Sequence, residues 1–182
     1  MKYFQKLKGE RIYLSPISPQ DYEQYTKWMN DHRITDNLGI SRILYDVDKE
    51  KEFLTSAQKN DYHFAIINYS DDKLLGNVSL FNLNSVNQTA DFGTFIGEET
   101  NRNKGYGTEA GRLVLNYGFN TLNLRNIMLK VFSFNKAAIA CYEKLGFKKI
   151  GIRRQSYFIH GRFHDEVYMD ILREEFTPHS VV

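Results

Sequence analysis

The sequence is short of cysteine and of net charge, and each shortage excludes a class of protein. Cys141 is the single cysteine, so no disulfide can form within the chain, and a reducing compartment is the expected setting. The 24 basic and 22 acidic side chains leave a formal net charge of +2, whereas nucleic-acid-binding domains usually carry a strong basic excess. We therefore expect a cytoplasmic protein that does not bind nucleic acid.

Long apolar runs are absent as well. No 18 consecutive residues are apolar, and the first residues, MKYFQKLKGER, lack the apolar core of a signal peptide, so we expect no membrane association. The 182 residues, of which 42% are hydrophobic, suit one domain of ordinary size. Because no repeat, linker or low-complexity segment divides the chain, residues 1–182 are predicted to form a single domain.

The stretch from residue 90 to residue 119 predicts a strand, a loop and a helix. Residues 90–97 (ADFGTFIG) mix apolar, β-branched and small side chains, as expected of a strand. A helix is predicted after the loop, because apolar side chains follow the spacing i, i+3, i+4, i+7 at Ala110, Leu113, Val114 and Tyr117.

The loop between them has the pattern R-x-x-G-x-G, formed by Arg102, Gly105 and Gly107. Glycines before a helix permit a tight turn and the close approach of a ligand, and the free N–H groups of a helix N-terminus bind anions. The pattern therefore predicts a pyrophosphate site. The alternative is an ordinary loop in which Arg102 is a solvated charge.

The remaining segments predict an α+β fold with a central mixed, mostly antiparallel sheet of about seven strands and about four helices. Strands at 63–69, 74–83 and 90–97 are joined by short turns and imply an antiparallel meander. The helix that follows should place a strand at 127–134 parallel to the strand at 90–97. The other predicted strands are 11–17, 147–159 and 163–172, with a turn at His160-Gly161-Arg162. The other predicted helices are 20–29, 48–59 and 136–145. In the helix at 48–59, Phe53, Leu54 and Ala57 are expected to face inward. Residues 30–45 show no clear hydrophobic period and are predicted to be irregular.

The helix at 136–145 carries a second pair of candidate residues. Asn135 and Tyr142 are seven positions apart, about 20° short of two full turns, so both side chains leave the same side, about 10 Å apart. One can contact the body of an elongated ligand and the other its reactive end. The alternatives are a helix N-cap for Asn135 and a packed tyrosine for Tyr142. Cys141 falls on the apolar face and is interpreted as a small buried hydrophobe.

Together these segments resemble the GNAT superfamily of acyl-CoA-dependent N-acyltransferases. Residues 102–107 (RNKGYG) follow the strand ADFGTFIG and are similar to the family's pyrophosphate loop, R/Q-x-x-G-x-G/A. Residues 135–147 (NKAAIACYEKLGF) are similar to its N-x-x-A-x-x-x-Y-x-K-x-G-F segment. The stretches RIYLSP, WMND and GRFHD resemble the branch typified by ribosomal-protein N-terminal acetyltransferases.

The resemblance implies an acetyl-CoA-binding core at about 90–150 and direct transfer of an acetyl group from acetyl-CoA to a primary amine. The acceptor would be a small molecule or a protein, with a protein N-terminus, a polyamine and an amino sugar as candidates, and a homodimer is compatible with it. Tyr142 is implied as the general acid, Asp91 as a residue that acts on the amine through water, and Asn135 as a ligand of the CoA arm. The other residues implied in cofactor binding are Phe95, Ile96, Gly97, Arg102, Asn103, Lys104, Gly105, Tyr106, Gly107 and Thr108.

Two other interpretations stay open. Residues 105–110 also satisfy the G-x-G-x-x-A fingerprint of dinucleotide-binding oxidoreductases, although seven residues separate Gly97 from Gly105 and that fingerprint follows its strand directly. A non-catalytic domain that binds CoA or a partner protein is the second alternative. No cluster of His, Cys, Asp or Glu has metal-ligand spacing, so no metal is expected.

Overall fold

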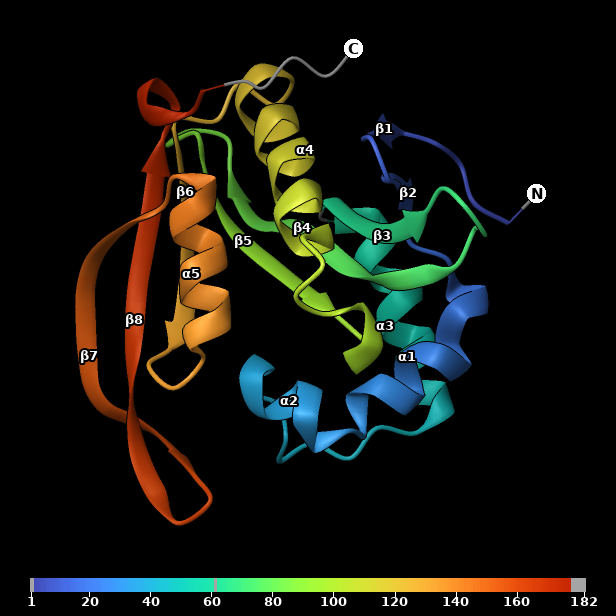
Figure 1. Cartoon of the computed structure of the whole chain (residues 1–182), viewed down its shortest axis with the longest axis horizontal. Helices are drawn as coiled ribbons and strands as arrows, with labels where there is room; N and C mark the ends of the chain where they lie inside the picture. The colour runs from blue at the N-terminus through green and yellow to red at the C-terminus, as the bar shows by residue number, and fades with distance from the viewer. Residues whose placement is uncertain (1, 61, 178–182) are drawn as a thin grey trace.

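One sheet of eight strands organises the computed structural model, which describes residues 2–60 and 62–177, without the side chains of residues 58–60 (Figure 1). The strands lie in the order β1-β2-β3-β4-β5-β6-β8-β7. The strands are β1 (Leu7–Lys8), β2 (Ile12–Pro16), β3 (Tyr62–Asn68), β4 (Leu74–Asn84), β5 (Thr89–Ile96), β6 (Asn126–Phe132), β7 (Lys148–Ile159) and β8 (Arg162–Leu172). The helices are α1 (Tyr22–Met29), α2 (His32–Leu38), α3 (Val47–Asn60), α4 (Tyr106–Asn120) and α5 (Lys136–Leu145).

The pairing of the strands follows the predicted topology. Strands β3, β4 and β5 form an antiparallel meander, and β5 pairs parallel to β6 after the crossover through α4. Both predictions are confirmed. The predicted turn between β7 and β8 is confirmed too, because His160 and Gly161 both have positive φ, as a two-residue hairpin turn of type I′ requires.

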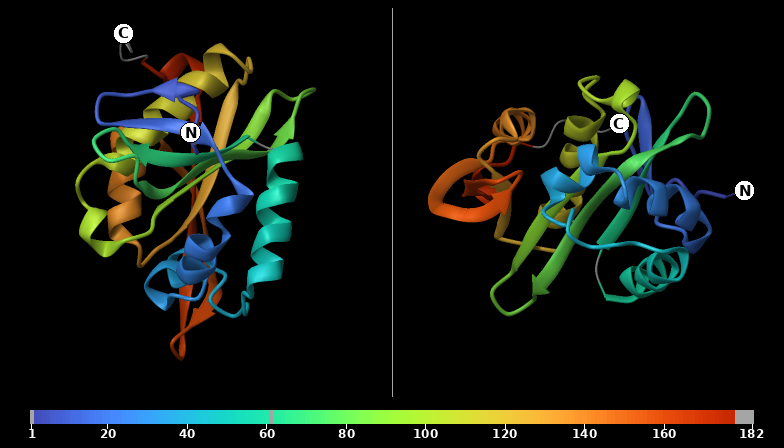
Figure 2. Two further views of the ribbon diagram at one scale, coloured as in Figure 1. Left: turned by 90° about the vertical axis from the view of Figure 1, so that its right-hand side faces the viewer. Right: turned by 90° about the horizontal axis from the view of Figure 1, so that it is seen from below.

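Alternation along the strands gives the sheet two apolar faces. Ile12 and Leu14 of β2 join the core under α4 and α5, whereas Tyr13 between them joins the core under α1, α2 and α3. Figure 2 shows α4 and α5 on one side of the sheet and α3 on the other. The sheet therefore lies between two helical layers.

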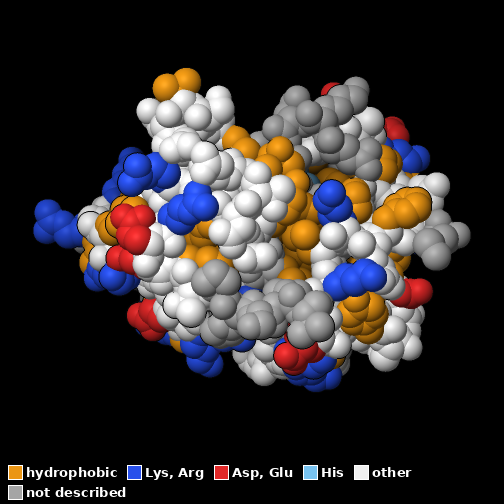
Figure 3. All heavy atoms as spheres, turned by 90° about the horizontal axis from the view of Figure 1, so that it is seen from above, with side chains coloured by type: hydrophobic (Ala, Val, Ile, Leu, Met, Phe, Trp, Pro, Cys, Tyr) orange, Lys and Arg blue, Asp and Glu red, His pale blue; other side chains and the backbone are white. Residues whose placement is uncertain are grey.

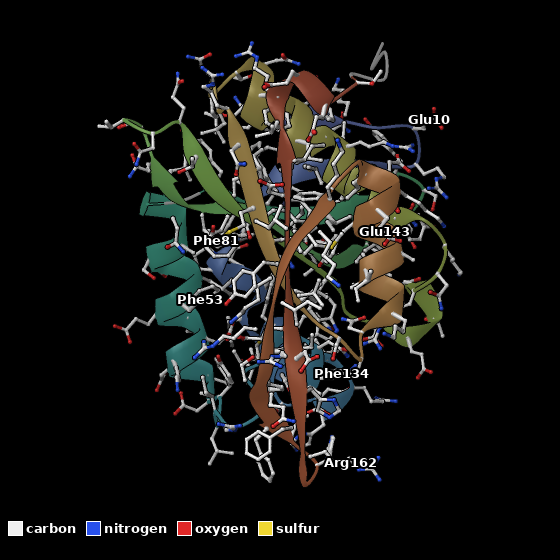
Figure 4. The ribbon with its side chains drawn as sticks, turned by 90° about the vertical axis from the view of Figure 1, so that its left-hand side faces the viewer. Glu10, Phe53, Phe81, Phe134, Glu143 and Arg162 are labelled. Carbon is white, nitrogen blue, oxygen red and sulfur yellow. The ribbon has the colours of Figure 1, made fainter. Side chains whose placement is uncertain are left out.

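The structure refines the predicted number of elements and corrects two other predictions. The described residues form eight strands and five α-helices instead of about seven and about four, because β1 adds a two-residue edge strand and α2 adds a helix. The segment 30–45 was predicted to be irregular, but Asp31 caps α2 by accepting from the Arg33 N–H at 2.9 Å, and Gly39 ends it at φ 76°. Its seven residues are too few to show a helical period. Phe53 was predicted to face inward but is 47% exposed, although the edge of its ring meets His63 of β3 with centroids 6.0 Å apart (Figure 4).

A carboxyl group lies buried in the first turns of α3. Glu50 is only 1% exposed, and its Oε2 has no hydrogen-bond partner among the described residues. Burial raises the pKa of Glu50 to about 7, because the charged form has lost its hydration. The folded state therefore favours the protonated form, and ionisation costs stability.

Replacing Glu50 by Gln should remove this pH-dependent cost. Because the folded-state pKa exceeds the usual 4.5, wild-type stability is expected to fall as the pH rises from about 4.5 through 7. At about 1.4 kcal/mol per pKa unit, the stability of Glu50→Gln relative to wild type should increase by about 3 kcal/mol between pH 4.5 and pH 8.5. Urea unfolding at both pH values measures it, with Glu52→Gln on the exposed face of α3 as control. A difference that stays constant with pH would contradict the assignment.

Candidate active site

Strands β5 and β6 separate soon after they meet. They pair only where Thr89, Ala90 and Asp91 face Asn126, Ile127 and Met128. Beyond this point β5 continues to Ile96 along β4, and β6 continues to Phe132 along β8. The facing backbone edges at 92–96 and 129–132 thus have no strand between them, and such an edge can pair with an extended, amide-bearing ligand.

The start of α4 lies beyond the open end of β5. Gly105 is the N-cap residue, with a left-handed φ of 85°, and it makes no side-chain capping bond. The first intrahelical bond runs from the Glu109 N–H to the Gly105 carbonyl at 3.0 Å. In the part of the chain that the structure describes, the backbone N–H groups of Tyr106, Gly107 and Thr108 have no hydrogen-bond partner. Free N–H groups at a helix N-terminus can bind an anion, and these three are called the candidate anion site below.

Arg102 binds backbone carbonyl groups near the end of β5. Its guanidinium donates to the carbonyl of Ile96 at 3.2 Å and to the carbonyl of Gly97 at 2.9 Å. It therefore joins the end of β5 to the loop before α4. Asn103 follows with φ 58° and, with Gly105, turns the chain into the helix.

Tyr142 lies where β5 and β6 part. Its ring packs edge-on against Phe92, the first residue of β5 beyond the shared pairing, with centroids 5.9 Å apart. It is 8% exposed, and its hydroxyl has no hydrogen-bond partner among the described residues. Burial, with a smaller effect of Cys141, raises the pKa of Tyr142 above its ordinary value, so the phenol carries its proton at neutral pH.

The helix that carries Tyr142 packs directly on the helix of the anion site. Thr108 Oγ1 lies 3.2 Å from Cys141 Sγ, and a side chain at Gly111 would collide with Leu145. Cys141 is half-buried, and burial raises the pKa of its thiol, which agrees with its interpretation as a packing residue. The anion site and the phenol are thus fixed relative to each other by α4–α5 packing.

Two of the predicted site residues have partners of their own. Asn135 Oδ1 accepts from the Ala138 N–H at 3.1 Å, so Asn135 is the N-cap of α5, the alternative given above. Asp91 accepts from Asn82 Nδ2 at 2.8 Å and follows buried Ala90 in the strand, so its side chain leaves the sheet on the opposite face from Tyr142.

A pocket of about 290 Å³ opens between α2, the loop before α5 and the β7–β8 hairpin. His160 Nε2 lies 2.7 Å from Asp36 Oδ2, and this contact joins α2 to the hairpin. Phe134, which precedes Asn135 in the chain and is labelled in Figure 4, lines the pocket. In Figure 1, α2 lies between the β7–β8 half of the molecule and α1. Sequence reasoning missed this pocket, because residues more than 100 positions apart build it.

The part of the chain that the structure describes shows neither a metal site nor a membrane-spanning helix. Among residues 2–60 and 62–177, no three His, Cys, Asp or Glu side chains are placed to hold a metal ion. No described helix is both long and apolar enough to cross a membrane. On the face seen in Figure 3, Lys and Arg side chains are interspersed with Asp and Glu.

Comparison with known proteins defines the class. The family model described as "Acetyltransferase (GNAT) domain" matches residues 11–148. The protein named "Probable N-acetyltransferase YjcK" of Bacillus subtilis (strain 168) is 34% identical over 178 residues, covering 93% of this chain and 98% of its own length. The spermidine N(1)-acetyltransferase of Escherichia coli (strain K12) is 29% identical over 151 residues, 80% of each chain.

The solved structures agree on the fold. The crystal structure of spermidine N-acetyltransferase from Vibrio cholerae in complex with CoA and spermine superposes with a TM-score of 0.83 at 24% identity, covering 91% of this chain and 97% of that one. The fold is thus shared with that protein. The chain belongs to the GNAT acetyltransferase family and is an acetyl-CoA-dependent N-acetyltransferase.

A substitution at the open end of β5 should show how tightly this end is fixed. A Cβ added at Gly97 would lie 2.0 Å from Cε2 of Trp28, whose indole is buried and donates to Glu98 Oε1 at 3.3 Å. We expect Gly97→Ala to lower the free energy of unfolding by about 2–3 kcal/mol or more, because the ring has no room to move.

Gly151→Ala is the matched control, since a Cβ at Gly151 in β7 meets no heavy atom within 4 Å. Its stability should stay within about 0.5 kcal/mol of wild type. Urea unfolding measures both variants. Equal stabilities of the two variants would contradict the contact between Trp28 and Gly97.

Proposed function

We propose that the protein moves an acetyl group from acetyl-CoA directly to a primary amine, with Tyr142 as the general acid. The observation that carries the proposal is the position of the Tyr142 phenol. It lies at the point of separation of β5 and β6, on a helix packed against the helix that offers the anion site. A thioester with a phosphate-bearing tail has partners for its tail, its arm and its sulfur in this arrangement.

In this proposal, different cofactor-binding residues contact different parts of acetyl-CoA. The N–H groups of Tyr106, Gly107 and Thr108 suit the pyrophosphate, and the positive end of the helix favours its charge. The free edge of β5 near Phe95, Ile96 and Gly97 suits the amides of the pantetheine arm. Asn103 and Lys104 line the exposed loop, and Asn135 keeps its side-chain N–H groups for the arm while its oxygen caps α5.

The reaction forms one bond and breaks another. The amine nitrogen attacks the thioester carbonyl, and the carbonyl electron pair becomes a tetrahedral oxyanion, which a backbone N–H of the open β5 edge stabilises. The intermediate then collapses, the carbon–sulfur bond breaks, and Tyr142 gives its proton to the leaving thiolate. The raised pKa of Tyr142 keeps this proton in place until the thiolate forms.

The acceptor approaches from the face of α2 and the β7–β8 hairpin in this proposal. The pocket beside Phe134 opens there, next to Asn135. A polyamine is one candidate, because the relative from Escherichia coli is named for spermidine. A protein N-terminus and an amino sugar are the others, and Asp91 is the candidate that takes the amine proton through water. A homodimer is part of the same proposal.

The phenol of Tyr142 is tested by its removal. Tyr142→Phe keeps the ring against Phe92 and Phe147, and turnover is expected to fall by about 100-fold or more, the scale of general acid catalysis. Tyr117→Phe is the control, because Tyr117 packs against Tyr62 and Phe64 and not against Phe92 at the separation of β5 and β6. Thiol release from acetyl-CoA with a panel of amines measures the rate. Turnover of Tyr142→Phe equal to wild type would remove the assignment.

Ligand binding tests the class independently of the acceptor. Acetyl-CoA at 100 times its Kd should stabilise the protein by about 2.7 kcal/mol, which a thermal shift detects, whereas NAD should leave the melting temperature unchanged. The opposite result would favour the oxidoreductase interpretation.

A further inference from the structure

The turn between β1 and β2, which contains Glu10 (labelled in Figure 4), is hydrogen-bonded to the first turn of α4, next to the loop of the candidate anion site. Glu109, in the first turn of α4, accepts at Oε1 from the backbone N–H groups of Glu10 and Arg11, both at 2.8 Å, and of Ile12 at 3.3 Å. Its Oε2 accepts from Arg11 Nε and Nη2, both at 2.9 Å. One carboxylate therefore ties α4 to a segment about 98 positions earlier in the chain.

The guanidinium of Arg11 also contacts the loop itself. Its Nη1 donates to the carbonyl of Lys104 at 2.8 Å, and it lies 5.1 Å from the ring centroid of Tyr106. A Cβ at Gly105, the N-cap of α4, would lie 3.2 Å from Nη2. The cation that touches the start of α4 is thus Arg11, whereas Arg102 of the glycine motif donates to β5 carbonyls.

Three of the five N–H groups of Arg11 are used by these bonds, and its side chain is half-exposed. The carboxylate of Glu109 is an anion close to a site for anions, and five donors occupy it. Without Arg11, Oε2 of Glu109 would be left as an uncompensated negative charge beside the phosphates.

We propose that Arg11 is a phosphate-binding and loop-positioning residue of the cofactor site, and that its pairing with Glu109 both fixes the loop and masks the carboxylate. The proposal rests on acetyl-CoA being the acetyl donor. It assigns to the first β-hairpin a role that lies outside both motif segments.

The test compares two thioesters. Arg11→Ala should raise KM for acetyl-CoA and the Kd of CoA by about tenfold, the scale of a charge-assisted hydrogen bond, with kcat changed less than twofold. With S-acetylpantetheine, which lacks the phosphates, kcat/KM should change less than twofold. Arg11→Lys keeps the positive charge but lacks the planar guanidinium. Its KM for acetyl-CoA and its Kd for CoA should lie between those of wild type and Arg11→Ala. Arg125 is exposed, and its side chain has no hydrogen-bond partner among the described residues, so Arg125→Ala should match wild type for both thioesters.

A double variant tests the masking. Glu109→Gln in the Arg11→Ala background removes the exposed charge, so it should recover at least half of the lost CoA affinity on a logarithmic scale. Hydrogen exchange at residues 103–108 in the free protein should be faster in Arg11→Ala than in wild type.

The outcomes distinguish a failure of the proposed role of Arg11 from a failure of the proposed function. Equal losses with acetyl-CoA and S-acetylpantetheine would show a purely structural role and overturn the inference, as would an unchanged Kd of CoA in Arg11→Ala. No recovery in the double variant would overturn the masking by Glu109. If the wild-type protein bound no CoA by calorimetry, the proposed function would fail, and the role of Arg11 would fail with it.

Discussion

The short parallel pairing between β5 and β6 is the constraint on which the site depends. Three residue pairs hold the two halves of the sheet together, and beyond them each strand follows its own neighbour. The ring of Tyr142, from α5, packs against Phe92 at the point of separation. A backbone edge is thereby kept free inside a packed protein, where unpaired N–H and C=O groups are otherwise rare.

The charges around this opening are arranged by tertiary contacts. Arg102 donates to the carbonyls of Ile96 and Gly97. Glu98 accepts hydrogen bonds from the Lys27 ammonium and the Trp28 indole, and both lower the pKa of Glu98. Arg11 and Glu109 neutralise each other next to the free N–H groups of α4. An entering anion thus meets a positive helix end whose nearby carboxylate is already satisfied.

Much of the fold could be predicted from the sequence, because it depends on local patterns. Alternation and turn residues located seven of the eight strands, and helical spacing located four of the five helices. The helix α2 could not be predicted, since seven residues give no period and its stability comes from its caps and from Ile34 in the core. The exposure of Phe53 could not be predicted either, because spacing does not say how deeply a side chain near the edge of the apolar face of α3 is buried against β3.

By itself the sequence determined the order of elements, the glycine-marked helix start at Gly105 and the helix that carries Tyr142. These follow from φ preferences and from the 3.6-residue turn, which act within a few residues. Only the tertiary structure decided that Arg102 binds carbonyls, that Arg11 reaches the start of α4, and that α2 meets the β7–β8 hairpin. Such contacts join residues far apart in the chain, and packing of the whole core sets their distances, so no local pattern encodes them.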